Sequence, residues 1–336
     1  MIFPSANKEL VSLAQLRYFI LLQAGEFGFR RRAEDYSRFQ PENADTGTMA
    51  EAKRLGGHTS GQFTVTTPAK IILCGEHSVV YGKLALAASV DLFTHINVTI
   101  QPSSSISIHL DTLEFDWSVS PADLLQASCQ KGSQLIDHLK QMIDDQVADP
   151  SIRASLLCIC YLYCSLVTKP IGLTMRIRSA IPVGAGLGSS AALSVAVSAA
   201  FHVIQHSATS DATFVADEAT INHWAFQCEK LFHSTPSGID NAVCTYGGIV
   251  KFQKEVVGSV AIPEARIILV NTQVSRQTKL LVQAVRRRRD HFPSVVDPIL
   301  DAMDQLSNQL AEVVLQPPEN NYESIHVTEK KMLTDE

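Results

Sequence analysis

The stretch from Ile181 to Ala192, IPVGAGLGSSAA, places glycines at 184, 186 and 188, directly before two serines and two alanines. The preceding segment, IGLTMRIRS, alternates apolar and polar residues, which predicts a strand. The following segment, SSAALSVAVSAAFHVI, is rich in alanine and carries no charge, so we predict a buried helix. A strand, a glycine loop and a helix in this order can bind phosphate, because the free N–H groups of a helix N-terminus attract anions and glycine lets them approach.

Three better-known motifs do not fit this loop. A dinucleotide-binding GxGxxG would need glycine at position 189, where Ser189 stands. A Walker A loop would need lysine after its last glycine, and a hydrolase GxSxG would need glycine in place of Ala192. The pattern that remains, GxGxGSSA, favours phosphate binding over a structural turn but leaves both open.

The composition of the chain limits the classes of function. The 336 residues are 46% apolar and 18% charged, which is typical of a globular protein, and this length predicts two domains. A net charge of −6 gives no electrostatic reason to expect nucleic acid as a partner. The most apolar run without charge, residues 154–168, is shorter than the roughly 20 residues of a membrane span, so we expect none.

The seven cysteines are odd in number and stand mostly in apolar segments. Reduced cysteines of this kind favour an intracellular protein, and we expect a cytoplasmic location. Cys158, Cys160 and Cys164 could suggest a metal site, but they lack a CxxC spacing and a nearby histidine pair. Packing in the core is the favoured interpretation of these three residues.

Two further stretches carry candidate site residues. In PAKIILCGEHSVVYGKLAL, residues 68–86, Glu76 and His77 follow a glycine, and the alternation before them predicts one or two strands. In FQCEKLFHSTPSGIDNAVCTYGG, residues 226–248, Glu229 lies near the end of a predicted helix and Asp240 follows a Pro-Ser-Gly turn. One such carboxylate can hold Mg²⁺ while the other meets a reacting hydroxyl. Taken singly, each of these residues is more often a surface turn, a cap or a solvated charge.

Together, the three stretches resemble the GHMP small-molecule kinase superfamily and, within it, the mevalonate kinase family. A galactokinase is expected to continue GEH with Thr-Asp-Tyr, whereas Ser78-Val79-Val80 follows here. The segment LVNTQVSRQTKLLVQAVRRR, residues 269–288, is similar to a later stretch of mevalonate kinases. The resemblance extends from about residue 63 to about residue 289.

The resemblance implies an α+β fold of two domains: an N-terminal domain like domain 2 of ribosomal protein S5, and a ferredoxin-like C-terminal domain. It places the ATP-binding domain at residues 61–262 and a partial C-terminal domain at 263–336. Residues 1–60 are polar and aperiodic, and we expect an atypical or disordered extension there. The family's third motif, a glycine-rich run, is not found because no glycine follows Gly258, so we expect a truncated second domain.

The activity implied by the resemblance is ATP-dependent phosphorylation of mevalonate to 5-phosphomevalonate, a step toward isoprenoid and sterol precursors. ATP is then a co-substrate, Mg²⁺ a cofactor, and a homodimer a possible assembly. Two alternatives stay open at this point. One is a non-catalytic truncated form that binds nucleotide or a partner, and the other is a different GHMP kinase such as phosphomevalonate kinase.

The resemblance also implies roles for individual residues. Ser190 and Glu229 would hold Mg²⁺, and Asp240 would act on the substrate hydroxyl as a general base or an orienting group. Lys70 would pair with Asp240 and stabilise the developing alkoxide. The loop that binds the phosphates of ATP comprises Gly184, Ala185, Gly186, Leu187, Gly188, Ser189 and Ser190. Contacts with the substrate are expected from Glu76, His77 and Thr278. The arginine run 286–289 could attract an anionic substrate, although a solvated helix face is the favoured interpretation.

Overall fold

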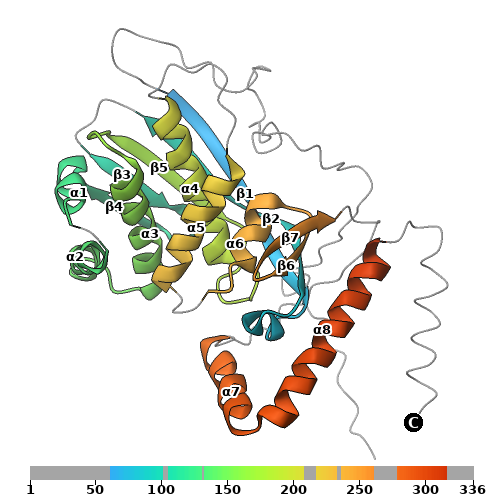
Figure 1. The fold of residues 1–336 in the computed structure, drawn as a ribbon. Coiled ribbons are helices and arrows are strands. Elements are labelled where there is room, and N and C mark those ends of the chain that lie inside the picture. The colour runs from blue at the N-terminus through green and yellow to red at the C-terminus, as the bar shows by residue number, and fades with distance from the viewer. Residues whose placement is uncertain are drawn as a thin grey trace, which may run out of the picture.

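The computed structural model describes residues 61–100, 105–130, 132–207, 217–232, 236–260 and 278–315. Helices and a mixed sheet form the α+β architecture that the sequence predicted (Figure 1). The strands are β1 Gly61–Cys74, β2 Ala85–Ile100, β3 Ile106–Leu110, β4 Phe115–Val119, β5 Leu173–Ser179, β6 Ile249–Gln253 and β7 Glu255–Val260. The α-helices are α1 Pro121–Ala127, α2 Ser133–Asp144, α3 Pro150–Leu166, α4 Ser189–Ser207, α5 Glu218–Phe232, α6 Ile239–Tyr246, α7 Thr278–His291 and α8 Pro293–Leu315. Short 3-10 helices lie at Ser78–Tyr81 (η2) and Asp111–Leu113 (η3).

The long strand β2 organises the seven-stranded sheet, whose order is β4-β3-β5-β2-β6-β7 with β1 on the other edge of β2. Residues 85–88 of β2 pair with β6, and residues 94–100 pair with β5. The strands β3 and β5 are parallel, and the other pairs are antiparallel. Because β2 spans both halves of the sheet, it joins the region around β5 and α4 to the region around β6 and α6.

A single strand, β1, runs through Pro68 and pairs with β2 along its whole length. Its register shifts between Pro68 and Ala69. Proline cannot donate a hydrogen bond to a neighbouring strand, and such an irregularity is where a sheet tolerates it. The sequence allowed one strand or two in this region, and the structure has one.

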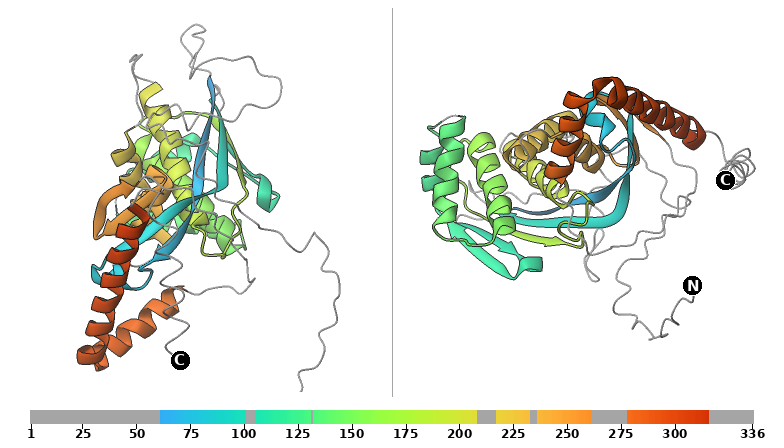
Figure 2. Two further views of the ribbon diagram at one scale, coloured as in Figure 1. Left: turned by 90° about the vertical axis from the view of Figure 1, so that its right-hand side faces the viewer. Right: turned by 90° about the horizontal axis from the view of Figure 1, so that it is seen from below.

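Helices α3, α4, α5 and α6 cover one face of the sheet, and the sheet curves around them (Figures 1 and 2). The predicted strand at β5 is confirmed, since Leu173, Met175 and Ile177 are buried toward this layer. The predicted buried helix is α4, which contacts both β1 and β2. On α3, Cys158 and Cys160 are fully buried, as the core interpretation of these cysteines predicted.

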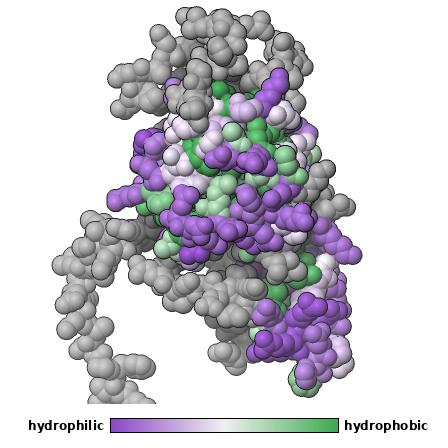
Figure 3. Space-filling model, turned by 90° about the vertical axis from the view of Figure 1, so that its left-hand side faces the viewer, coloured by the Kyte–Doolittle hydropathy of each residue, from purple (hydrophilic) through white to green (hydrophobic). Residues whose placement is uncertain are grey.

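Helices α7 and α8 pack on each other below this layered body, and α8 also contacts β2 and η2 (Figures 1 and 2). Near its C-terminal end, α8 places Leu310 and Ala311 against Leu84 and Leu86. Seen from the side of α1 and α2, the surface is mostly hydrophilic with scattered apolar areas (Figure 3). Among the described residues, no helix is both long enough and apolar enough to cross a membrane. The predicted extension at 1–60 and the predicted boundary after residue 262 lie outside the described residues.

Candidate active site

The glycine loop lies between β5 and α4, as the sequence predicted. Its three glycines, Gly184, Gly186 and Gly188, have φ angles of 75°, 78° and 75°. Glycine adopts this left-handed backbone without the steric cost that a Cβ atom would bring, so the alternating glycines are explained by the shape of the loop. Helix α4 begins at Ser189, and its unpaired N–H groups therefore face the loop.

Gly188 and Gly186 serve this loop in different ways. A Cβ atom on Gly188 would lie 2.6 Å from Cγ of Lys70, so the absence of a side chain leaves room for the lysine. The backbone N–H of Lys70 also donates to the carbonyl of Leu187 at 3.0 Å, which fixes β1 against the loop. A Cβ atom on Gly186 would meet no atom within 4 Å. The Gly186 side of the loop is therefore open to an approaching anion.

Lys70 forms an ion pair with Asp240, with 2.9 Å between Nζ and Oδ1. The lysine side chain is 6% exposed and the aspartate side chain 35% exposed. The ammonium is therefore buried, whereas the carboxylate is partly accessible to solvent. Asp240 stands in the first turn of α6, directly after Gly238 and Ile239, with Gly238 at a φ of 88°. A buried ammonium requires such a partner, because an unpaired charge in the interior is costly.

Glu229, in the last turn of α5, is only 2% exposed. Its pKa is raised from 4.5 to about 7, first because burial disfavours the charged form and then because Asp240 adds a second negative charge. A hydrogen bond with Ser190 and the positive charge of Lys70 oppose this rise in pKa. Side chains from β1, α4, α5 and α6 thus interact at one place, beside the glycine loop.

This cluster has the donors that a magnesium ion prefers. Two carboxylates and a hydroxyl supply oxygen atoms only, which suits a hard cation such as Mg²⁺. The negative charge of Asp240 helps to raise the pKa of Glu229, and a bound cation would relieve the same repulsion. The oxygen atoms of Ser190 and Glu229, which are hydrogen-bonded to each other, therefore fit a metal ion beside the glycine loop, with the negative charge of Asp240 nearby.

The structure gives the side-chain surroundings of two of the three predicted substrate residues, Glu76 and His77, and only the backbone of the third, Thr278. Glu76 is exposed, and it lies between the end of β1 and η2. The Nδ1 atom of His77 is buried and has no hydrogen-bond partner among the described residues. Thr278 is the first residue of α7, and its side chain lies outside the described part. The substrate contacts of all three stay predictions.

Sequence reasoning missed a link between the two helices that carry the carboxylates. The amide nitrogen of Asn241 donates to the side-chain oxygen of Asn222 at 2.6 Å and to its backbone carbonyl at 3.3 Å. This link holds α6 to α5 next to Asp240. In the sequence, the one hint was that Asn241 directly follows Asp240. Its partner Asn222 could not be identified, because it is 19 residues away.

The arginine run on α7 has two different surroundings. Arg286, Arg287 and Arg288 are exposed, as the interpretation of a solvated face predicted. Arg289 instead pairs with Asp297 of α8 at 2.5 Å and lies over the ring of Tyr81, 4.9 Å from its centroid. This cation–π contact was not foreseen from the sequence.

Comparison with known proteins places the chain among kinases. Residues 155–248 match the family model described as GHMP kinases N terminal domain. The chain is 36% identical over 291 residues to a mevalonate kinase of Mus musculus, which covers 78% of this chain and 73% of the relative. It is 35% identical over 273 residues to the mevalonate kinase of Homo sapiens, with 74% and 69% covered.

A solved structure supports the fold independently of these sequence matches. The crystal structure of the Methanococcus jannaschii mevalonate kinase superposes with a TM-score of 0.54 at 20% sequence identity. The matched region covers 75% of this chain and 73% of the Methanococcus jannaschii chain. At this identity the likeness concerns the fold alone, and the fold is the predicted GHMP kinase fold. Both mevalonate kinases are more than 30% identical to this chain, and the chain covers more than two thirds of each of them. The chain therefore belongs to the mevalonate kinase family of the GHMP kinases.

Proposed function

We propose that this protein transfers the γ-phosphoryl group of ATP to the primary hydroxyl of mevalonate, giving 5-phosphomevalonate and ADP. The observation that carries the proposal is the Lys70–Asp240 ion pair beside a glycine loop at the start of α4, in a chain of the mevalonate kinase family. Phosphoryl transfer depends mainly on positioning and on stabilisation of charge. The cluster offers groups for both tasks.

The glycine loop is proposed to bind the phosphates of ATP. Backbone N–H groups of residues 184–190 and the N-terminus of α4 provide positive partial charges at this point. The open side of Gly186 leaves room for a phosphate next to the backbone. Lys70 lies against Gly188, so its ammonium would stand close to phosphates bound by the loop.

Asp240 is proposed to accept the proton of the mevalonate hydroxyl. The hydroxyl oxygen then forms a bond to the γ-phosphorus while the bond from phosphorus to the β-bridging oxygen breaks, and ADP leaves with the bonding electrons. Lys70, 2.9 Å from Asp240, would stabilise the negative charge that develops on the substrate oxygen. Its pairing also orients the Asp240 carboxylate before substrate binds.

Ser190 and Glu229 are proposed to hold Mg²⁺, with Asp240 nearby. When bound, the ion supplies positive charge that offsets the charge of the phosphates. Ionisation of Glu229 is required for this role, so binding of the ion would release its proton, and the ion would bind more weakly below the raised pKa of about 7.

The proposal is tested by measuring ADP release from purified protein with ATP and, in separate reactions, mevalonate, phosphomevalonate or galactose. We expect turnover with mevalonate, and ³¹P NMR should show a phosphomonoester at its primary hydroxyl. Nucleotide binding without turnover on any of the three would contradict the proposal and favour a non-catalytic role. Turnover with phosphomevalonate but not with mevalonate would show that the protein is a phosphomevalonate kinase.

A cytoplasmic location and a homodimer belong to the same proposal. All seven cysteines are free thiols, and four of them, Cys158, Cys160, Cys228 and Cys244, are buried, which suits a reducing compartment. Fractionation of cells that express a tagged chain would check the location. Sedimentation analysis would check the dimer, and a single species of monomer mass at micromolar concentration would contradict it.

A further inference from the structure

The loop between β1 and β2, Gly75–Leu84, is closed at its base by direct contact between its two ends. A Cβ atom on Gly75 would lie 2.5 Å from the carbonyl oxygen of Leu84, and Gly75 has a φ of 84°. Within the loop, the N–H of Val79 donates to the carbonyl of Gly75 at 3.0 Å. Because Glu76 and His77 directly follow Gly75, the position of Leu84 constrains the two predicted substrate residues.

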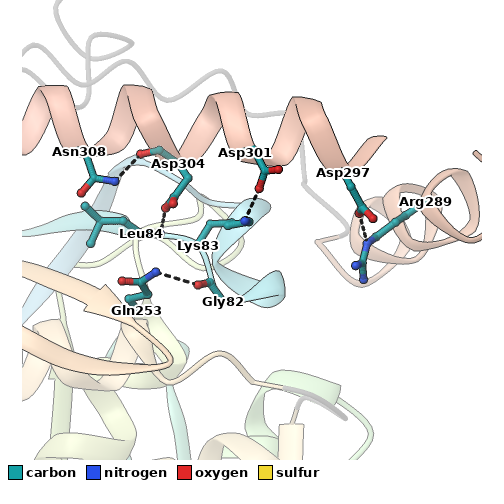
Figure 4. Close-up of polar contacts among 9 residues, drawn as sticks. All are labelled: Gly82, Lys83, Leu84, Gln253, Arg289, Asp297, Asp301, Asp304 and Asn308. Atoms are coloured by element: carbon teal, nitrogen blue, oxygen red, sulfur yellow. Dashed lines mark hydrogen bonds and ion pairs between the residues drawn. The ribbon is translucent and has the colours of Figure 1, made fainter. Parts of the chain in front are cut away.

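Helix α8 holds this closure point with carboxylates (Figure 4). The backbone N–H of Leu84 donates to Oδ1 of Asp304 at 2.6 Å, across 220 positions of sequence. One turn earlier on α8, Asp301 pairs with the ammonium of Lys83. Leu84 precedes β2 and has no partner in the β-ladder with β1, so the charged Asp304 oxygen satisfies a backbone donor at the end of the sheet.

Two more contacts fix other parts of the loop. The side-chain amide of Gln253, at the end of β6, donates to the carbonyl of Gly82 at 3.1 Å (Figure 4). Arg289 of α7 lies over the ring of Tyr81. The Gly75–Leu84 loop is therefore anchored by the sheet through Gln253 and by the α7–α8 pair through Arg289 and Asp304.

We propose that Asp304 is a positioning residue for substrate, with Asp301 in a supporting role. Through Leu84 and Gly75, Asp304 sets where Glu76 and His77 stand, so that α8 tunes the affinity for mevalonate without touching it. This inference rests on the proposed function, because it takes Glu76 and His77 as substrate contacts. Among the described residues the glycine loop contacts Lys70 of β1, through Leu187 and Gly188, and no contact of these two residues with α8 is found, so we expect the effect to concern mevalonate and not ATP.

The test compares steady-state kinetics of Asp304→Ala, Asp304→Asn and Asp301→Asn with the unchanged protein. Asp304→Ala leaves the Leu84 N–H without its acceptor, and we expect the KM for mevalonate to rise about tenfold while the KM for ATP stays within about twofold. Asp304→Asn keeps an oxygen acceptor, so it should retain most of the affinity. Asp301→Asn removes an exposed ion pair, and its effect should stay below about threefold.

Glu312→Gln is the matched control, because it removes a carboxylate from an exposed position of the same helix that has no hydrogen bond or ion pair with the described residues. It should change neither KM. A loss of thermal stability in Asp304→Ala with both KM values unchanged, or an equal rise of both, would overturn the inference. The same would follow if the control matched Asp304→Ala.

Hydrogen exchange separates failure of this inference from failure of the proposed function. Amide exchange in residues 75–84 should speed up in Asp304→Ala, while exchange in residues 184–190 should not change. If the unchanged protein does not phosphorylate mevalonate, the proposed function is wrong, and so is the substrate role of Asp304. If it does, and exchange in residues 75–84 is the same in the variant, Asp304 does not hold the loop and only the inference fails.

Discussion

Replacing Glu229 with glutamine should stabilise the protein at alkaline pH. The folded protein keeps the proton of Glu229 up to about pH 7, whereas the unfolded chain releases it near pH 4.5. Between these values the folded state binds more protons, so the free energy of unfolding falls as the pH rises. A difference of about 2.5 in pKa corresponds to about 3 kcal/mol of stability lost by pH 8. Glutamine cannot ionise, and the variant should keep that stability.

Urea denaturation at pH 5 and at pH 8, with EDTA present, measures this effect. The fluorescence of Trp224, on the same helix as Glu229, and of the buried Trp117 reports unfolding. At pH 5 the two proteins should differ by only about 1 kcal/mol, since the glutamate is then still protonated in the folded protein and is just past the midpoint of its ionisation in the unfolded chain. At pH 8 we expect Glu229→Gln to be more stable by up to about 3 kcal/mol.

The same urea denaturation, repeated with Mg²⁺ in place of EDTA, tests whether Glu229 binds the ion. If Glu229 is a ligand, Mg²⁺ should stabilise the unchanged protein at pH 8 more than it stabilises Glu229→Gln, because binding favours the folded, ionised form. Glu312→Gln, at an exposed position, should follow the unchanged protein at both pH values. The reasoning is refuted if Glu229→Gln shows the same pH dependence as the unchanged protein, since burial then does not hold the carboxyl group neutral.

Gly188→Ala should lower turnover by about 10² or more and weaken ATP binding, because its Cβ atom would meet Lys70 at 2.6 Å and its φ of 75° disfavours alanine; unchanged kinetics would contradict this. Gly186→Ala, with the same kind of backbone but open space at the Cβ position, should cost less stability in a thermal melt than Gly188→Ala. Asp240→Asn should lower kcat by about 10² or more with little change in the KM for ATP, and a loss of less than about threefold would show that Asp240 has no part in proton transfer.

The sequence by itself determined the parts of this protein that depend on local patterns. Alternation of apolar and polar residues predicted β5, and the uncharged alanine-rich run predicted α4, because strand and helix periodicities are read from adjacent residues. Alternating glycines between them predicted a loop that either binds phosphate or makes a structural turn, and the three positive φ angles show the backbone shape that requires glycine in either case. Family resemblance then named the residues to examine, Lys70 and Asp240 among them, although their roles are still to be tested.

Only the tertiary structure decided which residues meet and in what environment. The clash that keeps Gly188 free of a side chain comes from Lys70, which stands on a strand more than a hundred positions earlier. The raised pKa of Glu229 follows from burial and from Asp240, and neither is visible in a helix pattern. Asp304 reaches Leu84 across 220 positions. Such contacts depend on how the sheet and helices pack, and packing is a property of the whole chain rather than of any short stretch of it.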